Sequence, residues 1–184
     1  MVGRPEWRTT VRRGLVALVA GAVVATVHWA QEPRTPAVVW GGTDDSNEIV
    51  EFEVPEFSLP TVEGGTFGRD CLFGSRSALV FLNGGCRFCK MMVERLSGLE
   101  TRDGWSVAVV WHGSLAESER AAARLGAELT VAVDSTGVVH KAFGVTAVPQ
   151  TLLLDDQGRL ERAVKGWPSA WEALEEAGVS DAAR

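Results

Sequence analysis

Residues Ser77–Lys90 read SALVFLNGGCRFCK, a stretch that joins an apolar run directly to a pair of cysteines. Its first six residues form a short apolar run bounded by turn residues, which is typical of a strand buried on both faces. The Asn-Gly-Gly turn follows, and Cys86 and Cys89 open the next segment. The stretch therefore predicts a buried strand, a tight turn and a helix whose first turn holds both cysteines.

The start of a helix gives a cysteine a specific chemistry. The first turn has unpaired N–H groups and the positive end of the helix dipole, and both stabilise a thiolate. We therefore expect the pKa of Cys86 to lie below the value of about 8.5 for free cysteine. Arg87 and Lys90 add positive charge nearby. Because the thiolate is the species that attacks disulfides, Cys86 is predicted to attack and Cys89 to resolve the mixed disulfide.

Two other uses of the cysteine pair have less support. A zinc site needs two further ligands, and the remaining candidates form no second close pair; they are Cys71, His28, His112 and His140. A purely structural disulfide across so short a loop adds little stability. The sequence therefore predicts no metal and no other cofactor. Cys71 lies in a turn-like stretch and is expected to be unpaired.

The segments around this stretch alternate between strand and helix patterns. Pro149 cannot donate to a ladder, so we expect it at the start of a strand. Ser169 is expected to cap the last helix. The predicted strands are 48–53, 57–59, 66–67, 77–82, 106–111, 129–133, 151–154 and 160–164, and the predicted helices are 87–99, 116–125, 138–143 and 169–177. This order predicts an α/β fold with a mixed central sheet and helices on both faces.

The N-terminal segment is apolar and follows a basic flank. Residues 14–30 read GLVALVAGAVVATVHWA, without a charged side chain, and a run of this length is at the short end of the range for a transmembrane helix. Arg12 and Arg13 precede it, which predicts a cytoplasmic N-terminus and a body outside the cytoplasm. The alternative is a cleaved signal peptide, cut after Ala25 or Ala30. We favour the uncleaved anchor, and both alternatives place the body outside.

Composition and charge agree with this division. Hydrophobic residues make up 46% and charged residues 23% of the chain, which are globular values. The net charge of -6 argues against a nucleic-acid partner. We therefore predict a basic head and membrane anchor over residues 1–30, a Pro- and Gly-containing linker over 31–47 and a folded domain over 48–180.

The chain from about Glu53 to Trp167 resembles the thioredoxin superfamily, in particular its TlpA-like, membrane-tethered branch. The matching stretches are VPEFSLPTVEGG, SALVFLNGGCRFCK, AFGVTAVPQTLLLDDQGRL and VKGW. FLNGGCRFCKMM is also similar to the methylamine dehydrogenase accessory branch. The resemblance implies a thioredoxin fold, a nucleophilic Cys86, a resolving Cys89 and a cis bond before Pro149, beside the cysteines. It also implies that Val148 presents backbone groups to the substrate.

The sequence departs from this family pattern at the cysteine motif and behind it. Gly85 stands where Trp is usual, and Phe88 where Pro is frequent. Many members carry a buried acid on the central strand or one turn into the helix, and here Val80 and Met92 hold those places. These departures bear on the reduction potential and on how protons are handled during exchange.

The functional expectation is an extracytoplasmic thiol–disulfide oxidoreductase that reduces disulfides of partner proteins, with a membrane-bound electron donor or acceptor. Three alternatives remain. A disulfide-introducing oxidase uses the same residues. A peroxiredoxin-like peroxidase shares the FSLP start, but Leu79 and Asn83 stand where such enzymes have Pro and Thr. A non-enzymatic assembly or binding module is the third.

Overall fold

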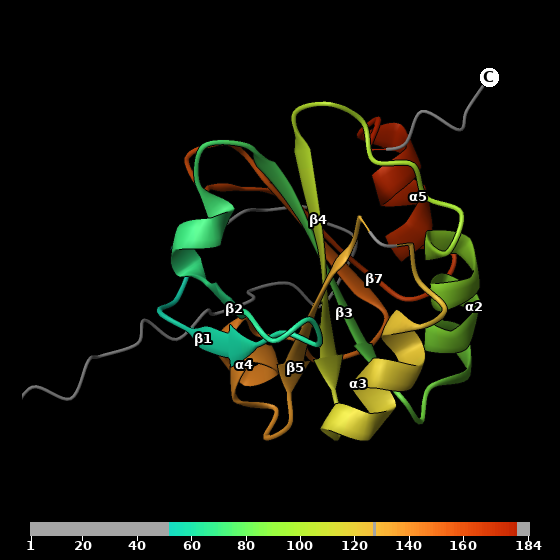
Figure 1. The fold of residues 1–184 in the computed structure, drawn as a ribbon. Helices are drawn as coiled ribbons and strands as arrows, with labels where there is room; N and C mark the ends of the chain where they lie inside the picture. The colour runs from blue at the N-terminus through green and yellow to red at the C-terminus, as the bar shows by residue number, and fades with distance from the viewer. Residues whose placement is uncertain (1–51, 127, 180–184) are drawn as a thin grey trace, which may run out of the picture. The chain divides into compact units, whose positions relative to one another are not determined.

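A five-stranded sheet forms the centre of the described domain (Figure 1). The computed structural model describes residues 52–126 and 128–179. The strand order is β5-β4-β3-β6-β7. The strands are β3 (Arg76–Asn83), β4 (Trp105–His112), β5 (Thr130–Asp134), β6 (Gln150–Leu154) and β7 (Leu160–Lys165). Strand β3 pairs parallel with β4 and antiparallel with β6, so the predicted mixed sheet is confirmed.

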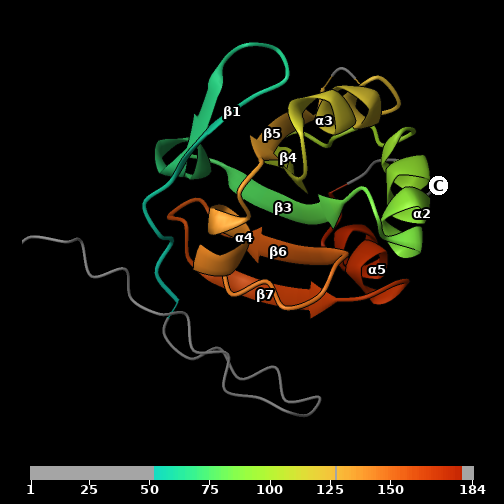
Figure 2. The ribbon, with the colours of Figure 1, turned by 90° about the horizontal axis from the view of Figure 1, so that it is seen from below.

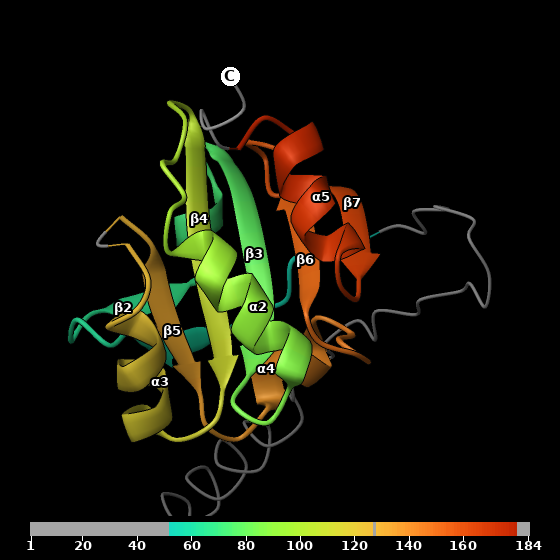
Figure 3. The ribbon, with the colours of Figure 1, turned by 90° about the vertical axis from the view of Figure 1, so that its right-hand side faces the viewer.

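Helices cover both faces of the sheet, as predicted. Helices α2 (Arg87–Leu96), α3 (Leu115–Ala122) and α5 (Ser169–Glu176) share one face, which Figure 3 shows toward the viewer. Helix α4 (Val138–Ala142) lies on the opposite face (Figure 2). The core on that face also includes residues of the hairpin β1 (Ser58–Pro60) and β2 (Thr66–Gly68) and of the short helix η1 (Arg69–Leu72).

Strand β3 is buried along most of its length. Its residues 78–82 are each at most 1% exposed, which confirms the strand predicted from the apolar run. Val80 packs in the core with α2 and α5. Phe81 points to the other face, where its ring centroid lies 5.0 Å from that of His140 and 5.4 Å from that of Phe143. Alternate side chains of one strand therefore hold two helical layers together.

Two local predictions are wrong. Phe52 and Glu53, the described part of the predicted strand 48–53, lie outside any strand. The Phe52 ring lies 6.1 Å from that of Phe143, so this apolar side chain packs onto the α4 face without strand pairing. Ser169 is not a cap either: the N-cap of α5 is Pro168, which follows a cis bond and makes no side-chain cap.

The predicted membrane anchor and the linker lie outside the described residues. Within the residues that the structure describes, no helix is both long and apolar enough to cross a membrane.

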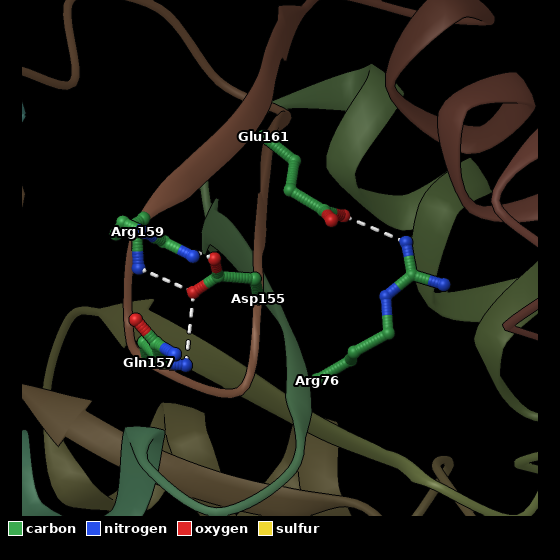
Figure 4. Close-up of polar contacts among 5 residues, drawn as sticks. All are labelled: Arg76, Asp155, Gln157, Arg159 and Glu161. Atoms are coloured by element: carbon green, nitrogen blue, oxygen red, sulfur yellow. Dashed lines mark hydrogen bonds and ion pairs between the residues drawn. The ribbon is translucent and has the colours of Figure 1, made fainter.

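A polar network orders the end of the sheet opposite the cysteines (Figure 4). Asp155 accepts hydrogen bonds from the backbone N–H groups of Gln157 and Arg159, at 2.9 and 2.8 Å, and pairs with the Arg159 side chain at 2.8 Å. Arg76, at the start of β3, pairs with Glu161 of β7 at 2.6 Å. The network sets the turn between β6 and β7, which confirms the predicted hairpin.

We expect Phe81→Ala to lower the free energy of unfolding by about 3–5 kcal/mol, because it empties a fully buried site between β3 and α4. Chemical denaturation measures the change. Phe73→Ala is the matched control, since Phe73 is 41% exposed and should cost about 1 kcal/mol or less. Similar losses in the two variants would contradict the assigned core.

Candidate active site

Cys86 sits at the N-terminus of the helix that follows the central strand. It is the N-cap of α2, and its Sγ accepts a hydrogen bond from the backbone N–H of Cys89 at 3.2 Å. The sulfur is half-buried and free. An N-cap acceptor satisfies one of the unpaired donors of the first turn, and negative charge there is favoured by the helix dipole. The structure therefore places the Cys86 sulfur on an N–H group of the first helical turn.

Cys89 occupies a very different environment. Its side chain is 0% exposed and packs in the core with Val80 and Met92. Burial, followed by the hydrogen bond with Cys86, raises the pKa of Cys89 from 9.0 to about 12, while a backbone hydrogen bond with Asn83 lowers it by less. Val80 and Met92, which share this core with Cys89, carry no ionisable group. At neutral pH, Cys89 is therefore a thiol within an apolar pocket.

The loop before β6 lies against the reactive sulfur. The thiol of Cys86 donates to the backbone carbonyl of Val148, with 3.5 Å between Sγ and O. The bond between Val148 and Pro149 is cis, as expected. Because β6 runs antiparallel to β3, its first residues reach the edge of the sheet where β3 ends. The structure thus brings the four residues 86, 89, 148 and 149 together.

The side chains between and after the cysteines face solvent. Arg87 and Lys90 are exposed on the first turn of α2, and Phe88 is 46% exposed. An influence of Arg87 and Lys90 on the cysteine pair remains a prediction.

A buried hydrogen-bonded pair of an aspartate and a histidine at the same edge of the sheet was not anticipated from the sequence. His140 Nδ1 lies 2.9 Å from Asp134 Oδ2, which also accepts the backbone N–H of His140 at 2.8 Å. Burial lowers the pKa of His140, and its hydrogen bond with Asp134 opposes that shift. His112, the exposed last residue of β4, lies opposite Asp134 in the register and has its ring 5.3 Å from that of His140.

One available signal pointed to this pair. The residues that end β3, β4 and β5 are Asn83, His112 and Asp134, and carboxyl ends of parallel strands meet at one edge. Applied to the polar residue at the end of each apolar run, that rule predicts that Asn83, His112 and Asp134 lie close together. The contribution of His140 depends on how α4 packs, which no local pattern records.

A mixed sheet, a cysteine pair opening the helix after its central strand, and a cis-proline loop against the first sulfur define a thioredoxin-fold protein. More specifically, the chain belongs to the AhpC/TSA family, whose profile matches residues 50–163, more than half of the chain. No curated protein sequence matches the chain significantly.

Solved structures of similar fold include several proteins described as acting on thiols and disulfides. A putative thiol:disulfide interchange protein DsbE from Chlorobium tepidum is 26% identical, with a TM-score of 0.55, over 68% of this chain and 92% of that one. The exposed lipoprotein thioredoxin of Streptococcus pneumoniae is 24% identical, with a TM-score of 0.53, over 66% and 98%. A secreted disulfide oxidoreductase of Mycobacterium tuberculosis is 19% identical, with a TM-score of 0.58, over 67% and 92%.

The different environments of the two thiols should appear in alkylation. In a Cys71→Ser background, which removes the exposed third thiol, we expect iodoacetamide at neutral pH to modify Cys86 at least about tenfold faster than Cys89, because Cys89 is buried and protonated. Peptide mass mapping before and after unfolding assigns the sites. Equal native rates would contradict the burial of Cys89.

The buried histidine should make stability depend on pH. Since the pKa of His140 is lowered from 6.5 in the folded protein, the unfolded chain binds more protons as pH falls through that value, and acid favours unfolding. We expect the Tm of the wild type to fall more steeply from about pH 7.5 to about 5.5 than that of His140→Asn, which keeps a donor for Asp134 but does not titrate. Parallel curves would refute this assignment.

Proposed function

We propose that the protein is an extracytoplasmic thiol–disulfide oxidoreductase that reduces disulfides of partner proteins through Cys86 and Cys89. The observation that carries the proposal is the difference between the two sulfurs. Cys86 is partly accessible and accepts a helix N–H, whereas Cys89 is a buried thiol one turn behind it. One group is suited to attack a protein disulfide, and the other can act only on a partner already attached to Cys86.

The exchange then proceeds in two balanced steps. The Cys86 thiolate attacks one sulfur of the partner disulfide, and the other partner sulfur leaves as a thiolate that takes up a proton. Cys89 next loses its proton and attacks Cys86 Sγ, which releases the second partner thiol. The partner gains two electrons, and the chain is left with a Cys86–Cys89 disulfide. A membrane-bound electron donor would return it to the dithiol.

Neighbouring groups support these steps. The carbonyl of Val148, held beside Cys86 by the cis bond to Pro149, is placed to accept a backbone N–H from an extended partner segment. Arg87 and Lys90 would favour the anionic form of Cys86. In the second step the proton of Cys89 must go to an acceptor outside its core, because Val80 and Met92, which share that core, cannot take up a proton.

The proposed location rests on the N-terminal sequence and on the relatives. The charge-free run 14–30 follows Arg12 and Arg13. Two of the similar structures are described as an exposed lipoprotein and as a secreted protein. A fusion of alkaline phosphatase after residue 184 should be active if the body lies outside the cytoplasm, and inactive if it does not.

A disulfide-introducing oxidase is the second candidate, because the N–H bond to Cys86 stabilises the reduced form of the pair. The reduction potential separates the two directions: a value near about -270 mV supports the reductase, and one near about -120 mV supports the oxidase.

Rapid consumption of hydrogen peroxide by the purified protein would instead support a peroxidase, and an unchanged cellular phenotype in Cys86→Ser would support a binding module.

We expect Cys89→Ser to accumulate mixed disulfides with partner proteins, because the step that releases them is blocked. Non-reducing electrophoresis and mass spectrometry of the adducts provide the measurement. Both variants are made in the Cys71→Ser background, because Cys71 is exposed and free. The matched control is Cys86→Ser, which should trap nothing, since Cys89 is buried. If Cys89→Ser traps no protein and the wild type does not reduce a model disulfide such as insulin, disulfide exchange is excluded.

A further inference from the structure

A groove runs between α2 and α3, beside the cysteine pair. It has a volume of about 470 Å³, and its lining includes Gly84, Lys90, Trp111, Arg120 and Arg124. Gly84 precedes Cys86 by two residues, and Lys90 directly follows Cys89. Figure 3 shows that α2 and α3 cover the same face of the sheet. The groove is therefore next to the proposed reactive sulfur, on a different side from the Val148 loop.

The charge of the groove is positive in a chain whose net charge is -6. Lys90 and Arg120 form no ion pair within the described part of the chain, and Arg124 makes only an exposed pair with Glu94 at 3.4 Å. Such an exposed pair contributes about 1 kcal/mol or less, so Arg124 can exchange it for a ligand.

One carboxylate also lines the groove, and it is already engaged. Glu117 closes the capping box of α3, where its Oε2 accepts the backbone N–H of Ser114 at 2.8 Å and the hydroxyl of Ser114 at 2.7 Å. These bonds hold the carboxylate on the N-terminus of α3. Three cations against one engaged carboxylate leave the groove with a net positive charge.

The indole of Trp111 forms a buried part of the groove wall. Trp111 is only 6% exposed, and its indole Nε1–H has no acceptor among the described residues. The ring carbon Cζ2 is the part of this side chain near Gly84, another residue of the lining, so Trp111 contributes an apolar part of the wall.

We infer that this groove binds an acidic segment of the partner protein, close in sequence to the partner's disulfide. The inference rests on the proposed function and adds the class of substrate. Carboxylates of the partner would face Lys90, Arg120 and Arg124, while the rest of this acidic chain repels them. Complementary charge of this kind orients a partner and raises its association rate. The groove thus selects disulfides with acidic neighbours.

The geometry sets where those neighbours lie. Lys90 lies four positions after Cys86, which corresponds to a helical rise of about 6 Å. An extended peptide advances about 3.3 Å per residue. Acidic side chains about two to four positions from the attacked cysteine therefore reach the groove.

The test uses the reduced full-length protein and two synthetic peptides, each with one disulfide, that differ only in carrying glutamates or glutamines at those positions. Each rate of reduction is divided by the rate of the same peptide with dithiothreitol, which removes intrinsic differences between the disulfides. For the wild type at low salt we expect the glutamate peptide to react about three- to tenfold faster, a preference that about 1 M salt abolishes.

Two charge-reversal variants locate the effect. Arg120→Glu should lose the preference, whereas Arg95→Glu, an exposed position on α2 outside the groove lining, changes the net charge equally and should keep it. Equal reduction of both peptides by the wild type, or an equal loss of the preference in both variants, contradicts the inference that the groove binds acidic segments. Neither result affects the proposed function.

A cysteine-free version of the glutamate peptide separates binding from exchange. Its affinity, followed by fluorescence anisotropy of a labelled copy, should fall in Arg120→Glu and not in Arg95→Glu. If neither disulfide peptide is reduced but this binding pattern is found, the proposed function fails and the groove stands. Binding that does not differ between the two variants overturns the groove.

Discussion

The burial of strand β3 on both faces is the constraint on which the rest of the domain depends. Residues 78–82 alternate between the core under α2 and α5 and the core under α4, and each edge of the strand is paired. The polypeptide can leave a strand enclosed in this way only where the strand begins or ends. The turn after Asn83 therefore fixes the position of α2, and of the two cysteines, at the end of the central strand.

This placement makes two chemically identical side chains different. Cys86 remains at the boundary with solvent, where its sulfur accepts the backbone N–H of Cys89. Cys89 turns inward to the apolar core, where desolvation raises its pKa to about 12. One helical turn separates them, and the proposed division of work between attack and resolution rests on that separation.

Much of this arrangement was predictable because its signals are local. The apolar run of β3, the glycine turn and the placement of the cysteines belong to one continuous stretch, and the alternation of later segments implied a mixed sheet. Alternation at 48–53 was misleading for its described residues, since Phe52 packs its ring on Phe143 outside any strand. The Asp134–His140 pair and the basic groove between helices are products of tertiary packing, which joins residues from separate elements.

The depth of Cys89 also bears on damage by oxidants. Peroxides attack thiolates that they can reach, and a buried, protonated sulfur offers neither condition. A sulfenic acid formed on Cys86 would have Cys89 one turn away, and their condensation to a disulfide is a reversible end point. Apolar packing around the second cysteine therefore preserves a repair route that keeps the first from advancing to irreversible sulfinic and sulfonic acids.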